Sequence, residues 1–456
     1  MISPARTLAF ETIRATFERE AHSERFFREA ADREGLGGRE RAQAQRLAYG
    51  AVQRRGTVDA AIERLAERST RLLDPPVLAA LRLGLYELLF ADGTPDHAAV
   101  DQSVELVKAA QAAHAAGLVN AVLRRAVRER KALTGMLLGD DSTPERAAIA
   151  HSAPLWLAQL WWEELGPPSA RSLLAACNEP AESALRVNTL RADRESLLEG
   201  LREDGVDARA AEGDWPLAAR EEVVLTGRGG DVVPARIEAG ELTPQSRGSA
   251  AVVELLDPQP GDHVLDLCAG PGIKTGQIAA RMGDRGETIC FERDPERAAE
   301  VAAQAGRLGL RNVTVVEADA TAPAMPTGFD RVLVDPPCSD LGALASRPDA
   351  RWRKSPKAIE RLAGLQAGIL AAGVELLRPG GTLVYSTCTV SRREGEEQVA
   401  ALERRSSAGE ISAFTVEDLG AMAPALASSH DSRCLQLRPD RDRTTGFFVC
   451  RLRKDG

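Results

Sequence analysis

Two cysteines near the carboxyl end of the chain each follow a short apolar run with the composition of a β-strand. One run leads into Asp335-Pro336-Pro337-Cys338-Ser339, and the other ends in Tyr385-Ser386-Thr387-Cys388-Thr389. Parallel strands of one sheet end at a shared edge, which is where open α/β domains bind ligands. The sequence therefore predicts that two thiols and the carboxylate of Asp335 converge on one pocket.

A thiol, an acid and a base around one pocket are the groups needed to methylate carbon 5 of a cytosine. That carbon is a poor nucleophile until a thiolate adds to carbon 6 of the ring, and an acid near N3 stabilises the charge that builds up. A base then removes the proton from carbon 5 so that the thiolate can leave. Cysteine suits the first step because a nearby lysine or helix N-terminus increases its thiolate fraction.

The alternative is that Cys338 and Cys388 are small buried hydrophobic residues, the commonest role of a cysteine outside disulfides. We favour a catalytic role because both lie on predicted functional loops. We expect Cys290, Cys434 and Cys450 to be structural. The sequence contains no Cys-x-x-Cys pair and its six histidines are scattered, so we expect no metal site.

A glycine-bearing turn lies between a predicted strand and a predicted helix, at Cys268-Ala269-Gly270-Pro271-Gly272-Ile273-Lys274. Glycine lets the backbone approach a ligand closely, and a helix N-terminus offers N–H groups. The turn lacks both the Walker A spacing and the three-glycine dinucleotide fingerprint. Glu292 ends the next strand, where a carboxylate can bind ribose hydroxyls, and Asp319 follows the third strand, within reach of an adenine edge. Singly each acid could be a helix cap or a solvated loop residue, but in this order they predict a site for S-adenosylmethionine.

Five short apolar segments beyond about residue 241 alternate with segments of helical composition. This alternation predicts a doubly wound, Rossmann-like α/β domain with a mostly parallel sheet over residues 241–456. The expected strands are His263–Cys268, Glu287–Glu292, Val313–Glu317, Arg331–Asp335 and Gly381–Thr387.

The first 140 residues have apolar residues at helical spacing and predict an all-α bundle. Residues 141–240 combine a helix at Leu155–Leu165 with short strands, and predict a small α+β module and linker. The helices expected in the bundle are Ala5–Phe17, Arg39–Val52, Val77–Phe90, His97–Ala109 and Leu118–Val127.

The net charge of −9 argues against a protein that coats nucleic acid through bulk electrostatics. A local arginine face could still bind RNA, although the arginine-rich composition is also explained by genome base composition. No apolar run reaches the ~18 residues of a membrane span, and the first twenty residues lack the pattern of a secretory signal. With an odd number of cysteines, seven, these features predict a cytoplasmic protein with reduced thiols.

The back half of the chain resembles the bacterial 16S ribosomal RNA cytosine-5 methyltransferases, known as RsmB, Sun or Fmu. The N-terminal bundle resembles the antitermination factor NusB, and the resemblance covers nearly the whole chain. The motifs that carry it are Pro95–Val100, Leu118–Arg125, Leu185–Leu190, Cys268–Thr275, Asp335–Ser339, Tyr385–Cys388 and Gly446–Phe448.

The resemblance implies that Cys388 is the nucleophile and that Cys338 assists release of the product from the covalent adduct. Asp335 would contact the target base, and Lys274 would lie near it. The helical domain would bind RNA, and the partner would be 16S rRNA or a partly assembled small ribosomal subunit; we expect a monomer. The residues implied to line the cofactor pocket are Cys268, Ala269, Gly270, Pro271, Gly272, Ile273, Lys274, Glu292, Asp319 and Asp335.

The chain departs from the family pattern at four positions. Ile273 replaces a glycine of the cofactor turn, and Asp340 replaces a small residue and adds a negative charge near the thiol. Gly395 replaces an asparagine and Thr445 an aspartate. Two alternative functions stay open: the same chemistry on tRNA or another ribosomal site, and a non-catalytic RNA-binding assembly factor. The two cysteines argue against the second, and the helical front domain argues against a small-molecule or protein methyltransferase.

Overall fold

The computed structural model describes residues 2–211, 216–227 and 229–456. The chain forms two compact units. One contains Met1–Pro180 together with Leu344–Ser355, and the other contains Ala181–Ala343 together with Pro356–Gly456. The limits predicted at residues 140 and 240 stay predictions.

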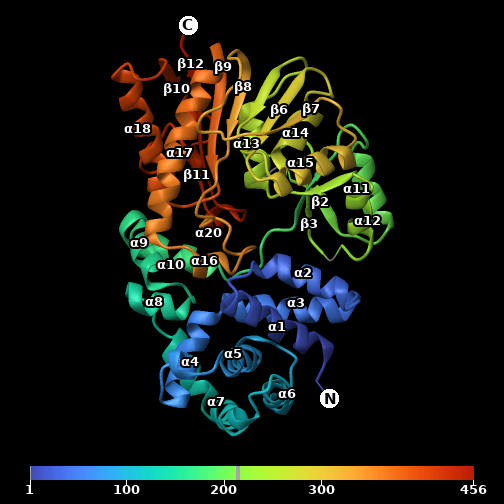
Figure 1. Ribbon diagram of the computed structural model, residues 1–456, viewed down its shortest axis with the longest axis vertical. Coiled ribbons are helices and arrows are strands. Elements are labelled where there is room, and N and C mark those ends of the chain that lie inside the picture. The colour runs from blue at the N-terminus through green and yellow to red at the C-terminus, as the bar shows by residue number, and fades with distance from the viewer. Residues whose placement is uncertain (1, 212–215, 228) are drawn as a thin grey trace. The chain divides into compact units, whose positions relative to one another are not determined.

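The first unit is helical throughout, as expected for the N-terminal bundle (Figure 1). The helix expected from Val77 begins at Pro75, which follows the N-cap residue Asp74 in the first-turn position that proline tolerates. Among the helices of residues 2–180, α2, α4, α8 and α10 were not predicted. The helices are α1 (Pro4–Glu18), α2 (Ser23–Arg33), α3 (Gly38–Gln53), α4 (Arg55–Ala66), α5 (Pro75–Phe90), α6 (Asp96–Ala109), α7 (Ala116–Leu138), α8 (Pro144–Ala150), α9 (Leu155–Leu165) and α10 (Pro167–Ala176).

Helix α5 lies at the centre of this unit. Its residues Leu81, Leu83 and Leu85 are completely buried although they do not share one helix face. A helix that is apolar all round is a buried helix. Leu8 and Ile13 of α1 belong to the same core, which explains the apolar spacing of the first segment.

The segment Leu344–Ser355 belongs to the helical unit, although in the sequence it separates the two parts of the other unit. It contains the short helix α16 (Ala350–Arg353). The buried guanidinium of Arg351 donates hydrogen bonds to the backbone oxygens of Ser152 and Cys177, at 3.0 and 2.8 Å. These bonds attach the segment to the helices of the unit.

The second unit begins with a small α+β module, as predicted. Its antiparallel sheet has the strand order β2-β3-β1-β4. The elements are β1 (Ala184–Val187), α11 (Arg194–Glu203), β2 (Ala208–Ala210), β3 (Glu222–Leu225), α12 (Val232–Glu238) and β4 (Leu242–Pro244).

The rest of the second unit is built on a mixed sheet with the strand order β10-β12-β9-β8-β5-β6-β7, and β11 pairs with β12. The strands from β9 to β7 are parallel, which confirms the predicted doubly wound domain, whereas β12 is antiparallel to β9. The antiparallel strands β10, β11 and β12 were not predicted. The strands are β5 (His263–Asp266), β6 (Glu287–Glu292), β7 (Val313–Glu317), β8 (Phe329–Val334), β9 (Leu377–Thr387), β10 (Phe414–Val416), β11 (Leu435–Leu437) and β12 (Phe447–Lys454).

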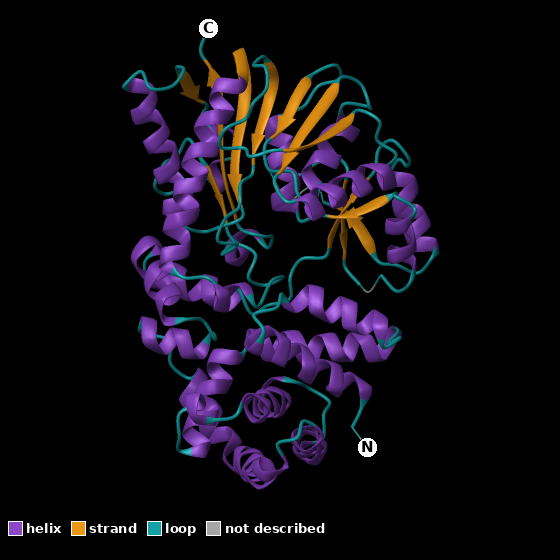
Figure 2. Ribbon diagram, in the orientation of Figure 1, coloured by secondary structure: helices purple, strands orange, loops and turns teal. Residues whose placement is uncertain are grey.

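Helices cover both faces of this sheet (Figure 2). Successive side chains of a strand point to opposite faces, and β9 shows this plainly. Leu383 and Tyr385 pack in the core that contains α17, whereas Val384 packs in the core that contains α13 and α14. The helices are α13 (Arg247–Leu256), α14 (Ile273–Arg281), α15 (Pro295–Leu308), α17 (Pro356–Leu376) and α18 (Glu396–Ser407). Among the described residues, no helix combines the length and apolarity needed to cross a membrane.

Replacing Arg351 with Met should destabilise the helical unit. The substitution removes the Arg351 donor from the backbone oxygen of Ser152 and leaves that of Cys177 with only the donor from Gln53. Each unsatisfied buried group costs about 1–3 kcal/mol. We expect the free energy of unfolding to fall by about 3 kcal/mol, as measured by urea denaturation. Lys357→Met, at an exposed position of α17, is the control. An unchanged unfolding midpoint for the Arg351 variant would show that these bonds do not anchor the segment.

Candidate active site

The turn between β5 and α14 has the geometry expected of a cofactor loop. Gly272 adopts a φ of 94° and precedes the first residue of α14, Ile273. Because Ile273 has a helical backbone, its Cβ is accommodated without strain, and the departure from glycine leaves the turn intact. The N-terminus of α14 provides N–H groups that can face a ligand.

A cavity of about 40 Å³ opens at this turn, on the carboxyl side of the parallel strands. Its lining contains seven of the residues expected in the cofactor pocket, together with one that was not predicted, Asp266. The seven are Cys268, Ala269, Gly270, Pro271, Ile273, Lys274 and Asp335.

Asp266 is the last residue of β5 and is buried. Burial raises the pKa of its carboxyl group to about 6. The hydroxyl of Thr275 donates to Asp266 Oδ2 at 2.8 Å, and the N–H of Cys268 donates to Oδ1 at 3.3 Å. The carboxylate therefore fixes the two ends of the cofactor turn. An acid at the end of an apolar strand, directly before a glycine turn, is the sequence signal that would have found it.

The two other predicted acids differ in their surroundings. Glu292 is buried beside the turn, and its Oε2 lies 3.5 Å from Nε of Arg297, which also donates to the backbone oxygen of Gly270. Asp319 is about half exposed, and its carboxylate accepts hydrogen bonds from the N–H and hydroxyl of Thr321. The lining of the small cavity includes neither acid. Glu292 thus lies against the turn, whereas the cofactor role of Asp319 stays a prediction.

Lys274 and Asp335 form a partly buried ion pair between the cofactor turn and the end of β8. Nζ of Lys274 lies 2.6 Å from Asp335 Oδ2, and the hydroxyl of Ser386 donates to Oδ1 at 2.8 Å. Burial lowers the pKa of Lys274, but the charge and hydrogen bond of Asp335 outweigh this effect, so the pKa is raised overall. A charged ammonium group is thereby held at the edge of the sheet where both cysteines lie.

The two predicted cysteines are in contact. The sulfur atoms of Cys338 and Cys388 are 3.1 Å apart, and the thiol of Cys388 also donates to Asp340 Oδ1 at 3.3 Å. Asp340 has a φ of 59°, which aspartate tolerates better than most residues. The three donor atoms lie within 4.8 Å of one another, and the expectation that the chain holds no metal stays a prediction.

The surroundings of Cys388 oppose its ionisation. The hydrogen bond with Cys338 and burial raise the pKa of the Cys388 thiol well above its ordinary value, and the negative charges of Asp340 and Asp335 raise it further. The thiol is therefore protonated at neutral pH. The expectation that Asp340 adds a negative charge next to the thiol agrees with the geometry.

The motif at Gly446 supports the cysteine loops. The N–H of Gly342 donates to the backbone oxygen of Cys388 at 3.0 Å, and the N–H of Gly446 donates to the oxygen of Gly342 at 2.8 Å. A Cβ at Gly342 would come within 2.2 Å of the Gly446 oxygen, so this approach requires glycine. Beside it, Nζ of Lys274 lies 5.0 Å from the ring centre of Phe447.

The motif that begins at Leu185 supports the cofactor turn from β1. Arg186 is almost completely buried and donates to the backbone oxygen of Ile273 at 2.8 Å and to the side chain of Gln245 at 2.9 Å. Asn188 donates to the backbone oxygens of Gly240 and Leu308, both at 2.9 Å. The small module therefore holds the first turn of α14 in place.

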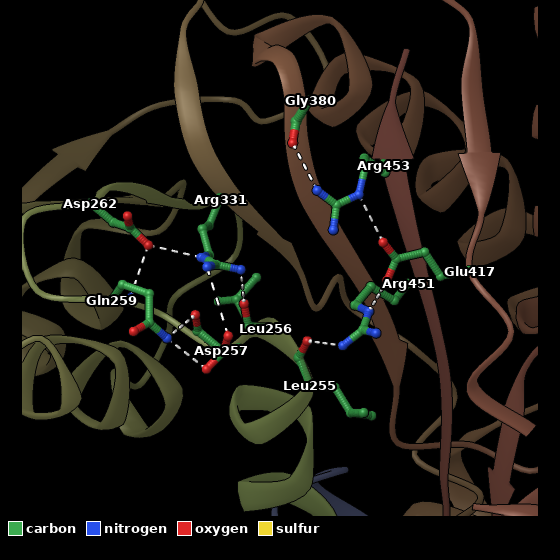
Figure 3. Close-up of polar contacts among 10 residues, drawn as sticks. All are labelled: Leu255, Leu256, Asp257, Gln259, Asp262, Arg331, Gly380, Glu417, Arg451 and Arg453. Carbon is green, nitrogen blue, oxygen red and sulfur yellow. Dashed lines mark hydrogen bonds and ion pairs between the residues drawn. The ribbon is translucent and has the colours of Figure 1, made fainter. Parts of the chain in front are cut away.

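A larger cavity, of about 280 Å³, lies at the opposite edge of the sheet, where β8 and β9 begin (Figure 3). Its charged side chains pair with one another. Nε of Arg331 lies 2.8 Å from the carboxylate of Asp262, and Nε of Arg453 lies 2.9 Å from that of Glu417. Four arginines and four acids line it, so their charges balance. The two thiols lie on the edge of the sheet that has the smaller cavity, not on this one.

Comparisons with known proteins agree with this arrangement. The 16S rRNA methyltransferase RsmB/F model matches residues 253–453, the NusB family model matches residues 3–128, and a ferredoxin-like domain model of RsmF/B-like methyltransferases matches residues 153–215. A probable ribosomal RNA small subunit methyltransferase B of Synechocystis sp. is 34% identical over the whole of both chains. Ribosomal RNA small subunit methyltransferase B of Escherichia coli is 32% identical over 82% of this chain and 84% of its own.

Solved structures share the fold. The crystal structure of PH0851 covers the whole of both chains with a TM-score of 0.81 at 24% identity. A methyltransferase homolog protein from Pyrococcus horikoshii covers 69% of this chain and all of its own, with a TM-score of 0.58 and 26% identity. The first of these likenesses shows the architecture alone.

A NusB-like helical region, a small module and an α/β methyltransferase domain define the class as S-adenosylmethionine-dependent ribosomal RNA methyltransferases. Within that class the chain belongs to the RsmB/F family of 16S rRNA methyltransferases. The family expected from the motifs is therefore confirmed, as is S-adenosylmethionine as the cofactor of the family.

Removing the charge of Asp340 should make Cys388 more reactive. Asp340→Asn keeps the size of the side chain and its tolerance of a positive φ, but it removes a negative charge that raises the thiol pKa. The pKa of Cys388 should fall, so alkylation by iodoacetamide should be several-fold faster at neutral pH, and its pH profile should move to lower pH. Mass spectrometry of the Cys388 peptide measures this rate.

Asp257→Asn is the matched control, because Asp257 also has a positive φ, of 51°, and lies at the other cavity. Equal pH profiles for the Asp340 variant and the unmodified protein would contradict the role given to this charge.

Proposed function

We propose that this methyltransferase forms 5-methylcytidine in 16S rRNA through a covalent bond between Cys388 and carbon 6 of the target cytosine. The observation that carries the proposal is the contact of the two sulfur atoms, 3.1 Å apart, beside the Lys274–Asp335 ion pair. This chemistry needs two thiols and a charged group that can act as an acid, all in one place.

The first step is addition of Cys388 to the base. The thiol gives its proton to the carboxylate of Asp340, to which it donates a hydrogen bond, and its sulfur bonds to carbon 6. This moves electron density toward carbon 5 and N3. Asp335 and Lys274 would give a proton or hydrogen bond to the ring, and this would stabilise the charge at N3. Because the resting thiol is protonated, removal of its proton is part of the cost of this step.

S-adenosylmethionine would bind at the turn between β5 and α14. The backbone of the turn from Cys268 to Lys274 and the N-terminus of α14 would hold the cofactor, and Glu292 would accept hydrogen bonds from its ribose. When bound there, S-adenosylmethionine supplies a methyl group from its sulfonium to carbon 5.

The last step is release of the product. In its thiolate form Cys338 accepts the proton of carbon 5, the electrons of that bond restore the ring double bond, and the bond from carbon 6 to sulfur breaks. Cys388 leaves as a thiolate. The contact between the two sulfurs supports this assignment, because the acceptor of the proton must lie next to the leaving group.

The substrate is ribosomal RNA of the small subunit, free or in a partly assembled particle, and the NusB-like unit is proposed to bind it. The predicted monomeric state and cytoplasmic location belong to the same proposal. Bisulfite sequencing of ribosomal RNA from cells with and without the gene tests it. A cytosine of 16S rRNA that is protected from bisulfite only in cells with the gene supports the proposal. Loss of protection at a tRNA cytosine instead would show that the substrate is tRNA.

The two cysteines should give opposite results when mutated. Cys388→Ser should abolish both methylation and adduct formation, because a hydroxyl is hardly ionised near neutral pH. Cys338→Ala should still attack and transfer the methyl group, but the product should remain attached to Cys388. A protein–RNA band that survives denaturing electrophoresis measures the trapped product, and the double mutant is the control. Trapping in Cys388→Ser instead would show that the roles are reversed.

Glu292→Ala should weaken cofactor binding. Each charge-assisted hydrogen bond to the ribose contributes about 1.5–3 kcal/mol, so its loss should weaken affinity by about tenfold or more. Calorimetric titration with S-adenosylmethionine measures this change. An affinity equal to that of the unmodified protein would remove Glu292 from the site.

A further inference from the structure

We propose that Glu394 is a positioning residue that holds the two cysteine loops together. It lies in the connection between β9 and α18, outside the motifs that suggested catalysis. The proposal rests on the proposed function for its consequence, since that function requires Cys338 and Cys388 to act on one base. The contacts themselves are independent of the reaction.

One carboxylate joins the residues that directly follow the two cysteines. The N–H of Ser339 donates to Glu394 Oε1 at 2.9 Å, and the Ser339 hydroxyl donates to Oε2. The hydroxyl of Thr389 lies 3.3 Å from the same Oε2 and 2.7 Å from the Ser339 hydroxyl. Ser339 follows Cys338 and Thr389 follows Cys388, so Glu394 connects the two loops through a single side chain.

Two further residues fix Glu394 itself. Gln366 of α17 donates to Glu394 Oε1 at 3.0 Å and to the backbone oxygen of Pro337 at 2.9 Å. The hydroxyl of Tyr385, on β9, donates to the backbone oxygen of Glu394 at 2.8 Å. Residues of a helix and a strand of the same unit therefore fix the position of Glu394. Its carboxylate cannot move with one cysteine loop and keep its bonds to the other.

Burial makes these bonds strong and costly to lose. The Glu394 side chain is completely buried, which raises its pKa, while the hydrogen bonds from Ser339 and Gln366 act in the opposite direction. A carboxylate offers about four acceptor positions. Ser339, Thr389 and Gln366 together supply donors to both oxygens, so the side chain is matched to this position.

The consequence is control of the sulfur–sulfur distance. The sulfur of Cys338 must reach the carbon 5 proton while Cys388 is bonded to the neighbouring carbon 6. A misplacement of about 1 Å can cost about a hundredfold in rate. Because Glu394 binds the residue next to each cysteine, losing it should let the two loops separate and should slow release more than attack.

Oxidative cross-linking measures the separation without any RNA. The oxidant diamide joins two thiols as a disulfide, taking up their two electrons and two protons as it becomes a hydrazine. The rate of formation of the Cys338–Cys388 disulfide in the full-length protein, followed by mass spectrometry, reports how often the sulfurs meet. This rate reports the distance between the sulfurs even if the proposed function is wrong.

Glu394→Ala should slow this cross-linking by about tenfold or more, the factor expected from losing hydrogen bonds of about 1 kcal/mol each. Glu394→Gln should keep most of the rate. Its amide oxygen can still accept from Ser339 and Gln366, and the hydroxyls can turn to accept from its NH2 group. Glu396→Ala is the matched control, because Glu396 is also buried but accepts its hydrogen bond from Ser428. It should cross-link at the unmodified rate.

Thr389→Val is a second test in case Glu394→Ala does not fold. It keeps the shape of the side chain and removes only the hydroxyl that bonds to Ser339 and Glu394, so it should give an intermediate rate. With RNA, Glu394→Ala should also increase the covalent adduct relative to finished product.

Cross-linking of Glu394→Ala at the unmodified rate would overturn the proposal. An equally slow Glu394→Gln would also overturn it, because charge rather than hydrogen bonding would then be responsible. If the variants cross-link as predicted but the unmodified enzyme forms no covalent adduct with RNA, only the proposed function is contradicted.

Discussion

The ion pair between Lys274 and Asp335 is the interaction on which the site depends. It connects the cofactor turn after β5 to the end of β8, and the Ser386 hydroxyl extends the connection to β9. Three adjacent parallel strands are thereby tied together at their carboxyl ends. Burial opposes the charge of Lys274 and the charge of Asp335 outweighs this effect, so the pair also fixes the charge of the pocket.

The parallel half of the sheet could be predicted from the sequence because strands covered on both faces are continuous apolar runs. β6 and β7 have the limits that were expected. The helices α2 and α4 carry the same spacing signal and were missed. Phe27, Ala30 and Ala31 are buried at helical spacing in α2, as are Val58, Ala61 and Ile62 in α4. Strands β10 and β11 have only three residues each, too few to show a period, and they exist through their pairing with β12.

The residues that their chemistry singled out in the sequence do lie together. The two cysteines at strand ends are in contact, and Lys274 pairs with Asp335 in the adjoining loops. Glu394 carries no such signal, because its importance comes from partners far apart in the sequence, Ser339 and Gln366. Patterns of residue type identify groups that react, but the groups that hold them are defined by tertiary contacts.

Because Leu344–Ser355 belongs to the helical unit, that unit is completed late during synthesis of the chain. Its buried Arg351 completes a unit whose other residues end at Pro180. During synthesis the ribosome must therefore translate most of the second unit first, which takes roughly ten to thirty seconds at about 5–20 residues per second. Until then the backbone oxygens of Ser152 and Cys177 lack their final donor. The helical unit is the first to be started, but it is complete only after Ser355 has been translated.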